Sequence, residues 1–243
     1  MTPILVLGAG HMGGALIEGW LATGAYRPSD LIISDPEPGE AAAKAVLAVP
    51  PQTWRDAAVE AAQHLAPDAI VVSLAAGVRT ADLAVAFAPR AVARTMPTTG
   101  VAVGKGAVSI YSDDDGARAA AHALFDPVAT TVDLANEALM DAAVAVSGSA
   151  PAYLYAFMEA LAAAGVSQGL SPEASKALVR ATMVGAAALL DRSGENPADL
   201  RRKVASPGGT TEAALKVLIG DAGLGPLLEA TVAAAARRSR ELG

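Results

Sequence analysis

A glycine-rich segment near the N-terminus has the residue types and spacing of a dinucleotide-binding turn. It reads Gly8-Ala9-Gly10-His11-Met12-Gly13 and matches G-x-G-x-x-G between a strand-like run and a helical pattern. In such a turn Gly8 permits the tight bend, Gly10 lets the backbone approach a pyrophosphate, and Gly13 lets the helix pack closely on the strand. Unpaired N–H groups and the positive end of the helix dipole then face the phosphates. The alternative is a turn that only packs tightly.

A carboxylate follows where such a site binds the adenosine ribose. Asp35 ends the second predicted strand, Ile33-Ser34-Asp35, and lies 22 residues after Gly13 (35 minus 13). An acidic residue about 20 residues beyond the glycines accepts a hydrogen bond from the ribose of NAD. The negative charges of Asp35 and Glu37 would repel a 2′-phosphate, which favours NADH over NADPH. The alternative is that Asp35 caps a turn before Pro36.

A second glycine-rich loop, Ser206-Pro207-Gly208-Gly209-Thr210-Thr211, has the features of an anion site. Gly208 and Gly209 open the backbone, and a helical pattern begins near Thr210. Consecutive N–H groups and the helix dipole would therefore face a carboxylate. The same letters also fit an ordinary helix N-cap preceded by two turn glycines. On these residues alone, both interpretations remain open.

The composition excludes several other kinds of site. The chain has no cysteine, so thiol nucleophiles, thiolate metal sites and disulfides are excluded, and its histidines, His11, His64 and His122, are scattered. The acidic run at 113–115 lacks the spacing of a calcium loop and predicts a helix cap. We therefore expect no metal site.

The charge and the hydropathy restrict the partners. A net charge of −7 disfavours binding to nucleic acid or to an anionic membrane, because both need a basic patch. No apolar stretch approaches the roughly 20 residues of a membrane span, and no basic segment of a signal peptide precedes the first strand. We expect a small-molecule substrate, no nucleic-acid or membrane partner, and a location in the reducing cytoplasm.

The hydrophobic pattern predicts an α/β protein of two domains. Up to Asn136, short β-branched runs alternate with alanine-rich helical stretches, as in a parallel sheet covered by helices. From Glu137 onward, apolar residues recur at helical spacing. We predict an N-terminal Rossmann-type dinucleotide-binding domain at residues 1–136, followed by an all-α dimerisation domain at residues 137–243. The predicted strands are 3–7, 30–34, 68–73, 91–95, 107–111 and 129–133, and the predicted helices are 12–23, 52–64, 80–87, 114–124, 139–164, 172–192, 210–219 and 224–242.

Two of the helical segments predict a partner molecule. Residues 183–190 and 227–236 are apolar around much of the helix circumference. A helix buried on all sides needs more partners than one small domain offers, so we expect these helices to pair with a second copy. Tyr153, Tyr155 and Phe157 are interpreted as core or dimer contacts.

Several segments together resemble pyrroline-5-carboxylate reductase, the last enzyme of proline synthesis. The loop at 206–211 resembles the family's S-P-G-G-[AT]-T motif, and residues 147–153, S-G-S-A-P-A-Y, are similar to S-G-S-G-P-A-Y. Residues 75–78 resemble A-A-G-V, residues 94–99 resemble R-x-M-P-N-T, and residues 48–52 resemble A-V-K-P-Q. The resemblance extends over nearly the whole chain.

The resemblance implies reduction of 1-pyrroline-5-carboxylate to L-proline by hydride transfer from NADPH or NADH to the cyclic imine. It implies that Thr211 is the catalytic residue and that its hydroxyl is hydrogen-bonded to the ring nitrogen. It also implies a homodimer, with larger assemblies of dimers left open. The residues implied for the substrate carboxylate are Ser206, Gly208, Gly209 and Thr210. The residues implied for the cofactor are those at 8–13 with Ser34, Asp35, Ala48, Val49, Pro50, Ala75, Ala76, Gly77, Met96, Pro97 and Thr98.

The sequence departs from the family pattern in three places. Ala150 replaces a glycine, and Thr98 and Gly100 replace an asparagine and a proline near the expected nicotinamide. Pro50 stands where a lysine is expected. A helix, a strand and a helix expected after Asp35 are largely missing, because residues 36–45 are too few for both a crossover helix and a further strand.

Two other functions remain as alternatives. A two-domain dehydrogenase of the β-hydroxyacid type would place a lysine on the long interdomain helix, and residues 139–165 contain none. A non-catalytic NAD(P)-binding protein would fit if the shortened cofactor domain and Pro50 had abolished turnover.

Overall fold

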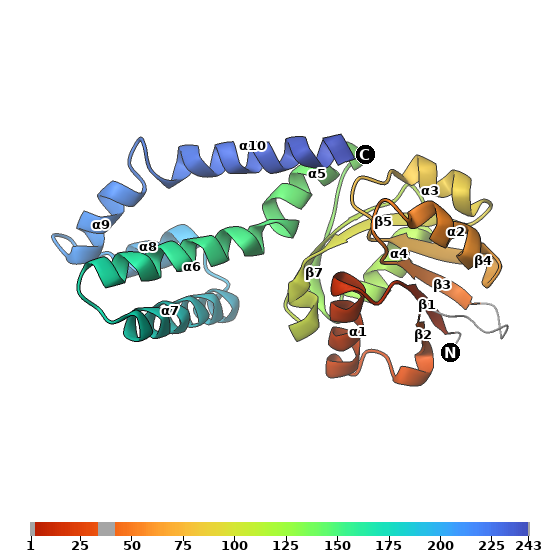
Figure 1. Ribbon diagram of the computed structural model, residues 1–243, viewed down its shortest axis with the longest axis horizontal. Coiled ribbons are helices and arrows are strands. Elements are labelled where there is room, and N and C mark those ends of the chain that lie inside the picture. The colour runs from red at the N-terminus through yellow and green to blue at the C-terminus, as the bar shows by residue number, and fades with distance from the viewer. Residues whose placement is uncertain (1–2, 34–41, 243) are drawn as a thin grey trace. The chain divides into compact units, whose positions relative to one another are not determined.

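The computed structural model describes residues 3–33 and 42–242 (Figure 1). The chain divides into two compact units, one of residues 1–149 with 234–243 and one of residues 150–233. Sheet gives way to helices after Asp133, close to the expected boundary at Asn136. The first unit nevertheless continues to Ser149 and also takes in the end of the last helix.

The first unit is built on a mostly parallel sheet, as the sequence predicts. Among the described residues the strand order is β2-β1-β3-β4-β5-β6-β7, and every neighbouring pair is parallel except β5 and β6. Apolar residues fill the centre, since all four residues of β1 are buried. The strands are β1 (Ile4–Leu7), β2 (Leu31–Ile33), β3 (Ala42–Leu47), β4 (Leu65–Ser73), β5 (Val92–Pro97), β6 (Gly106–Tyr111) and β7 (Ala129–Asp133).

Helices cover both faces of this sheet. The helices α1 (His11–Thr23) and α4 (Asp115–Phe125) contribute to one apolar core, where the Trp20 indole N–H donates to the Leu124 carbonyl at 2.7 Å. The helices α2 (Trp54–Ala62) and α3 (Thr80–Phe87) contribute to the other. A parallel sheet with two covered faces is the arrangement of doubly wound nucleotide-binding folds.

Strand β3 is absent from the sequence-based prediction. It lies between β1 and β4, with Val6 opposite Val46 and Lys44 opposite Ile70. Its sequence, AAKAVL, has three alanines and a lysine, which are depleted in strands, so its pattern does not indicate one. Only residues 34–41 separate β2 from β3, and β2 is an edge strand. The chain thus reaches the other side of β1 with a very short connection.

The predicted continuous helix at 139–164 is wrong. The chain instead forms a 3-10 turn η3 (Glu137–Leu139), a short helix α5 (Met140–Ala143) and a π turn η4 (Val144–Gly148) before α6 (Ala150–Ser167). The N–H of Ser149 donates to the carbonyl of Val144 at 2.9 Å, five residues back, and the Ser147 hydroxyl donates to the Ala143 carbonyl at 2.8 Å. Apolar periodicity continues through such a turn, so the sequence does not reveal the break.

The rest of the chain is helical, as predicted. Two helix N-termini have side-chain caps, since Ser171 accepts from the N–H of Ala174 and Asn196 accepts from that of Ala198. Within the first unit, the Ser239 hydroxyl at the end of the last helix donates to Asp141 at 2.6 Å. The helices are α7 (Pro172–Ser193), α8 (Pro197–Val204), α9 (Thr210–Leu218) and α10 (Leu224–Leu242).

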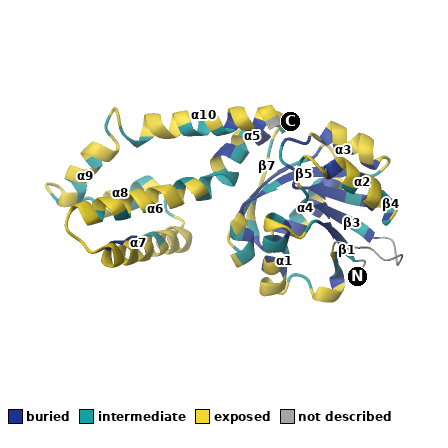
Figure 2. Ribbon diagram, in the orientation of Figure 1, coloured by how far each residue is buried: buried dark blue, intermediate teal, exposed yellow. Residues whose placement is uncertain are grey.

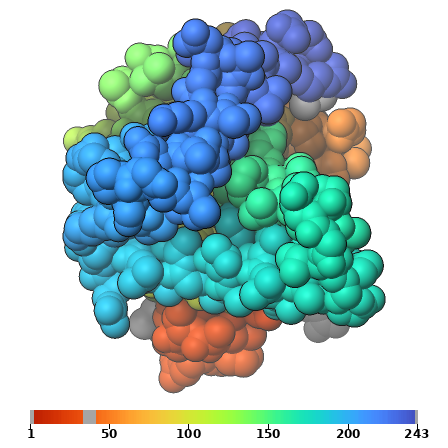
Figure 3. Space-filling model, turned by 90° about the vertical axis from the view of Figure 1, so that its left-hand side faces the viewer, coloured from red at the N-terminus to blue at the C-terminus, as the bar shows by residue number. Residues whose placement is uncertain are grey.

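The second unit has little apolar core of its own. Figure 2 shows mostly exposed residues along its helices, and Figure 3 shows the same unit in space-filling form, coloured green to blue. Helix α6 has no buried residue, and α7 buries only Ser175 and Val179. Tyr155 and Phe157 are exposed, so they are not core residues of this chain. Within residues 3–33 and 42–242, no helix is long and apolar enough to cross a membrane.

Candidate functional site

The glycine-rich turn has the expected geometry between β1 and α1. Gly8 has a φ of +94°, and a Cβ there would lie 2.7 Å from the Ala48 carbonyl oxygen. A Cβ on Gly13 would lie 2.0 Å from the Gly8 carbonyl oxygen. Both positions therefore require glycine, Gly8 for its left-handed backbone and Gly13 for the close approach of helix and strand.

Gly10 differs from these two glycines because nothing fills the space beside it. A Cβ on Gly10 would meet no atom of the described residues within 4 Å, and Gly10 is exposed. It is the N-cap of α1, with no side chain capping the helix. The first N–H groups of a helix have no partner within the helix, so this end offers donors and the positive dipole end to a phosphate.

The turn lies at a topological switch point of the sheet. From β1 the chain goes first to β2 on one side and then to β3 on the other, and ligands of such sheets bind outside the carboxyl ends of the strands there. Ala48 and Val49 follow β3 and contact this turn, since a Cβ on Gly8 would lie 3.1 Å from Val49 Cγ1. Pro50 comes next and is exposed. The residues at 8–13 and 48–49 thus lie together along the edge of the sheet formed by the carboxyl ends of the strands.

The next two strands bring two more predicted segments to the same edge. Residues 75–77 follow β4, where Gly77 has a φ of +76°, and residues 96–98 lie at and beyond the end of β5. The strands β4 and β5 are parallel, so both segments lie at carboxyl ends. A hydrogen bond of 3.1 Å from the Thr95 hydroxyl to the Ser73 carbonyl joins the strands.

Two contacts fix the segment at the end of β5. Thr98 pairs with Ala107 twice, because its N–H donates to the Ala107 carbonyl at 2.9 Å and its hydroxyl accepts the Ala107 N–H at 3.0 Å. The side chain of Met96 lies beside Gly148, whose Cβ position would be 3.6 Å from Met96 Cγ. The threonine that replaces the family's asparagine therefore has a structural role here.

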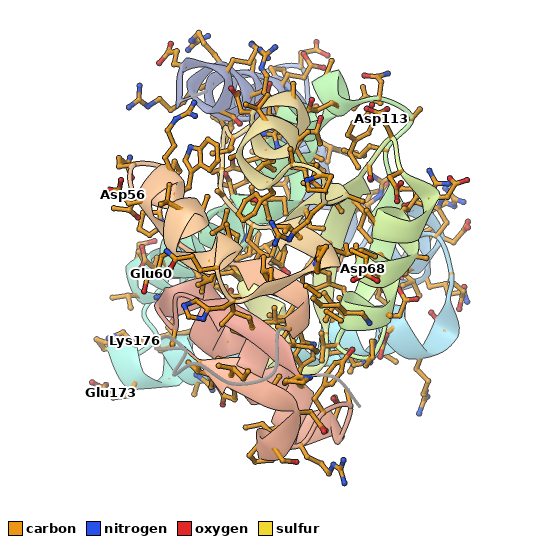
Figure 4. All side chains as sticks on the ribbon, turned by 90° about the vertical axis from the view of Figure 1, so that its right-hand side faces the viewer. Asp56, Glu60, Asp68, Asp113, Glu173 and Lys176 are labelled. Carbon is orange, nitrogen blue, oxygen red and sulfur yellow. The ribbon has the colours of Figure 1, made fainter. Side chains whose placement is uncertain are left out.

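A buried charge network lies beside these segments, and the sequence analysis did not find it. Arg94 donates to Glu137 Oε1 at 3.0 Å, and the backbone N–H and hydroxyl of Thr80 donate to the same carboxylate at 2.8 and 2.9 Å. A signal was present in the sequence, since an arginine in an otherwise buried strand requires a carboxylate partner. Nearby, a hydrogen bond to Asp113 (Figure 4) raises the pKa of the Tyr111 hydroxyl, with smaller contributions from burial and from the charges of Asp113 and Glu137.

The loop at 206–211 belongs to the second unit. Gly208 has a φ of +72° with no described atom within 4 Å of its Cβ position, and Gly209 is the N-cap of α9 without a side-chain cap. The Thr211 hydroxyl makes no hydrogen bond among the described residues. These features suit an anion beside the helix N-terminus.

Two N–H groups of this loop already have partners, because the N–H of Gly209 donates to the Ser206 carbonyl at 3.0 Å and that of Gly208 donates to a carboxylate. Glu212 accepts the N–H of Gly208 at 2.6 Å, as a glutamate in the first turn of a helix often does for a residue before it. The open donors are therefore those of Thr210 and Thr211 rather than those of Gly208 and Gly209. Glu212 is not among the site residues predicted from the sequence.

The predicted site residues therefore fall into separate groups. The cofactor residues that the structure describes lie along one edge of the sheet in the first unit, and the substrate residues lie in the second unit. Ser34 and Asp35 lie outside the described residues.

Known proteins resemble this chain along its whole length. The family model for pyrroline-5-carboxylate reductase dimerisation matches residues 137–242. A pyrroline-5-carboxylate reductase of Pseudomonas aeruginosa is 37% identical over 99% of this chain and 97% of its own length, and one of Arabidopsis thaliana is 38% identical over 81% and 72%. The alignment with the Pseudomonas protein spans 266 positions, so at least 23 of them (266 minus 243) have no counterpart here.

Solved structures share the fold. A pyrroline-5-carboxylate reductase from Coxiella burnetii has a TM-score of 0.89 and 28% identity, and it covers 100% of this chain and 98% of its own. A Plasmodium falciparum pyrroline carboxylate reductase with NADP bound has a TM-score of 0.83 and 25% identity, with the same coverage. Sequence identity above 30% over nearly the full length therefore establishes that the chain belongs to the pyrroline-5-carboxylate reductase family.

Proposed function

We propose that this protein reduces 1-pyrroline-5-carboxylate to L-proline with NADPH or NADH. The observation that carries the proposal is the loop at 206–211. Its two glycines and the helix N-terminus suit the carboxylate of the substrate, and the unpaired Thr211 hydroxyl suits the ring nitrogen. Family membership and the glycine-rich turn at 8–13 support it further.

The cofactor fits the sheet edge described above. Open space beside Gly10 and the N-terminus of α1 suit a pyrophosphate, while residues 75–77 and 96–98 lie at the carboxyl ends where a nicotinamide would reach. When bound, the nicotinamide supplies the hydride. We propose the residues at 8–13, Ala48, Val49, Pro50, Ser34 and Asp35 for the rest of the dinucleotide, with Asp35 favouring NADH.

The chain's residues then bind and orient the imine. The N–H of Thr210 and the side chain of Ser206 hold the substrate carboxylate, and Gly208 and Gly209 leave the backbone open for it. The Thr211 hydroxyl donates a hydrogen bond to the ring nitrogen. The hydride would add to the carbon of the C=N bond, which becomes C5 of proline, and the nitrogen would take its proton from solvent. Orientation is the main contribution, for which aligned reactants can provide about 7 to 11 kcal/mol.

We further propose that the active form is a homodimer built on the helical region, with larger assemblies of dimers open, and that it works in the cytoplasm. Exposed apolar side chains on α6 and α7 support the pairing, because Leu154, Tyr155, Val184 and Leu189 are all more than half exposed in a single chain. Contiguous exposed apolar surface on soluble proteins marks an interaction site.

A fluorescence titration followed by addition of the imine tests the function. We expect NADPH or NADH to bind, and the fluorescence of the bound cofactor to disappear when pyrroline-5-carboxylate is added. A protein that binds the cofactor but never oxidises it would fit the non-catalytic alternative, and turnover of a hydroxy acid instead would fit the dehydrogenase alternative.

The variant Gly10→Val tests the cofactor site in the same titration. The fold tolerates the new side chain because its Cβ would meet no described atom, yet its bulk lies where the pyrophosphate approaches. We expect loss of cofactor binding with an unchanged melting temperature. The control Gly225→Val, which also has open space at its Cβ, is expected to bind normally. Normal binding by Gly10→Val would place the cofactor elsewhere.

A further inference from the structure

A buried ion pair lies beside the cofactor segments, and the reaction described above does not use it. Arg94 on β5 is only 4% exposed, and its guanidinium Nη1 lies 3.0 Å from Glu137 Oε1. The Nε of Arg94 is also buried and meets no hydrogen-bond partner among the described residues. An unpaired buried charge is strongly unfavourable, so Arg94 depends on the carboxylate of Glu137.

The same carboxylate caps α3. Glu137 Oε1 accepts the Thr80 backbone N–H at 2.8 Å, and Glu137 Oε2 accepts the Thr80 hydroxyl at 2.9 Å. Thr80 is the first residue of α3, and the N-cap residue Arg79 supplies no side-chain cap. A carboxylate at this end satisfies helix N–H groups that have no partner within the helix. Glu137 therefore replaces the missing cap from a distant part of the chain.

The two elements held by Glu137 carry the two segments expected around the nicotinamide. The loop at 75–77 leads into α3, and Arg94 lies two residues before Met96 on β5. Glu137 itself begins η3, where the chain leaves the sheet toward Gly148, which contacts Met96. A shift of the carboxylate would thus move both segments relative to each other.

We propose that Glu137 is a positioning residue for hydride transfer, which holds the loop at 75–77 and the segment at 96–98 in register through Thr80 and Arg94. It touches neither the substrate nor the cofactor. The inference rests on the proposed reductase function, because that function places the nicotinamide at these segments.

Two substitutions at Glu137 distinguish the effect of its side-chain length from the effect of its charge. Glu137→Asp keeps the charge but shortens the side chain by one carbon–carbon bond of about 1.5 Å, so the carboxylate stays with the buried charge of Arg94 and no longer reaches Thr80. Glu137→Gln keeps the side-chain length, because its amide oxygen accepts from Arg94 and the Thr80 N–H while its NH₂ donates to the Thr80 hydroxyl. It removes the counter-charge of Arg94, so we expect a lowered melting temperature in this variant. Glu60→Asp on α2, an exposed position (Figure 4), is the matched control.

Positioning predicts that aspartate is more harmful to catalysis than glutamine. For Glu137→Asp we expect kcat to fall by about tenfold or more, because small misplacements of reacting groups have large effects on rate. With a cofactor deuterated at C4, the isotope effect on kcat is expected to rise above that of the parent. The cofactor Kd is expected to stay within about threefold, since the turn at 8–13 is unchanged.

Parent values of kcat and isotope effect in Glu137→Asp would overturn the proposal, as would a larger fall in kcat for Glu137→Gln than for Glu137→Asp. If Glu137→Asp does not fold, Thr80→Val tests the proposal instead. This substitution removes the Thr80 hydroxyl donor and leaves the ion pair of Arg94 and Glu137 intact. We expect kcat of Thr80→Val to fall by about threefold to tenfold, and an unchanged kcat overturns the proposal.

Hydrogen exchange tests the inference without turnover. In Glu137→Asp the Thr80 amide is expected to exchange at least about tenfold faster than in Glu60→Asp, because its acceptor is displaced. Unchanged exchange overturns the role of Glu137 whether or not the protein is an active reductase. A parent that never reduces the imine would refute the proposed function separately.

Discussion

At the scale of single residues, the proposed chemistry depends most on Thr211. Its hydroxyl has no partner among the described residues, so its removal should cost the fold little. In the proposed complex the hydroxyl donates a hydrogen bond to the ring nitrogen, and loss of a buried hydrogen-bond partner costs about 1 to 3 kcal/mol. For Thr211→Val we therefore expect kcat/KM to fall by roughly ten- to a hundredfold, with cofactor affinity nearly unchanged.

A matched variant and a melting curve make this test specific. Thr231→Val on α10 removes a hydroxyl that donates to its own helix, at the Leu227 carbonyl, and should leave the kinetics unchanged. A Thr211→Val protein with normal kcat/KM and a lowered melting temperature would assign Thr211 to the helix N-terminus rather than to the substrate.

The residues of the glycine turn were predictable from the sequence, whereas their neighbours were not. The letters at 8–13 specify a backbone conformation, and backbone geometry follows from glycine positions. The partners of the Gly208 N–H and of Arg94 are the carboxylates of Glu212 and Glu137. Glu137 lies 43 residues from Arg94, and no local pattern connects residues so far apart.

At the scale of elements, the pair α4 and β7 carries a pH-sensitive contact. His122 on α4 lies 3.1 Å from Asp126 Oδ1 through Nδ1 and 3.1 Å from Asp133 Oδ1 on β7 through Nε2. The hydrogen bond to Asp126 raises the pKa of His122 above its usual 6.5; burial opposes this shift, and the contact with Asp133 adds to it. The charged imidazole is thus favoured in the folded protein.

The sign of the resulting stability change follows from the raised pKa. The contribution of His122 to the free energy of unfolding is fully present below the unfolded pKa and is lost as the pH rises through the folded one. We expect the stability difference between the parent and His122→Gln to be larger at about pH 5.5 than at about pH 8.5, as measured by urea unfolding. An equal difference at both pH values would contradict the contact.

The elements themselves were mostly predictable, with two informative exceptions. Strands such as 129–133 and helices such as 224–242 have strong periodicity and clear ends, and both have the predicted bounds. Strand β3 was missed because its alanines fit a strand only through burial on both faces, which is a tertiary effect. The break at 144–148 was missed because a π turn keeps the apolar period nearly intact.

At the scale of the whole molecule, the helical region is expected to be completed by a second copy. Val184 on α7 is 65% exposed and Val85 on α3 is 82% exposed in the single chain. We expect Val184→Arg to shift the protein toward monomers, because a charge cannot be buried in an apolar interface without a partner. Val85→Arg should keep the parent assembly. Sedimentation velocity measures the oligomeric state of the parent and of both variants. A monomeric parent would refute the proposed homodimer.

The fate of the hydride shows whether this protein reduces the imine directly with the nicotinamide. The purified protein is incubated with pyrroline-5-carboxylate and NADPH or NADH carrying deuterium at the transferred position of C4, and the product is analysed by NMR. We expect L-proline with one deuterium at C5 for each cofactor oxidised, because the hydride passes directly from the nicotinamide to the imine carbon. Oxidation of the cofactor without deuterium in proline, or no proline at all, would contradict it.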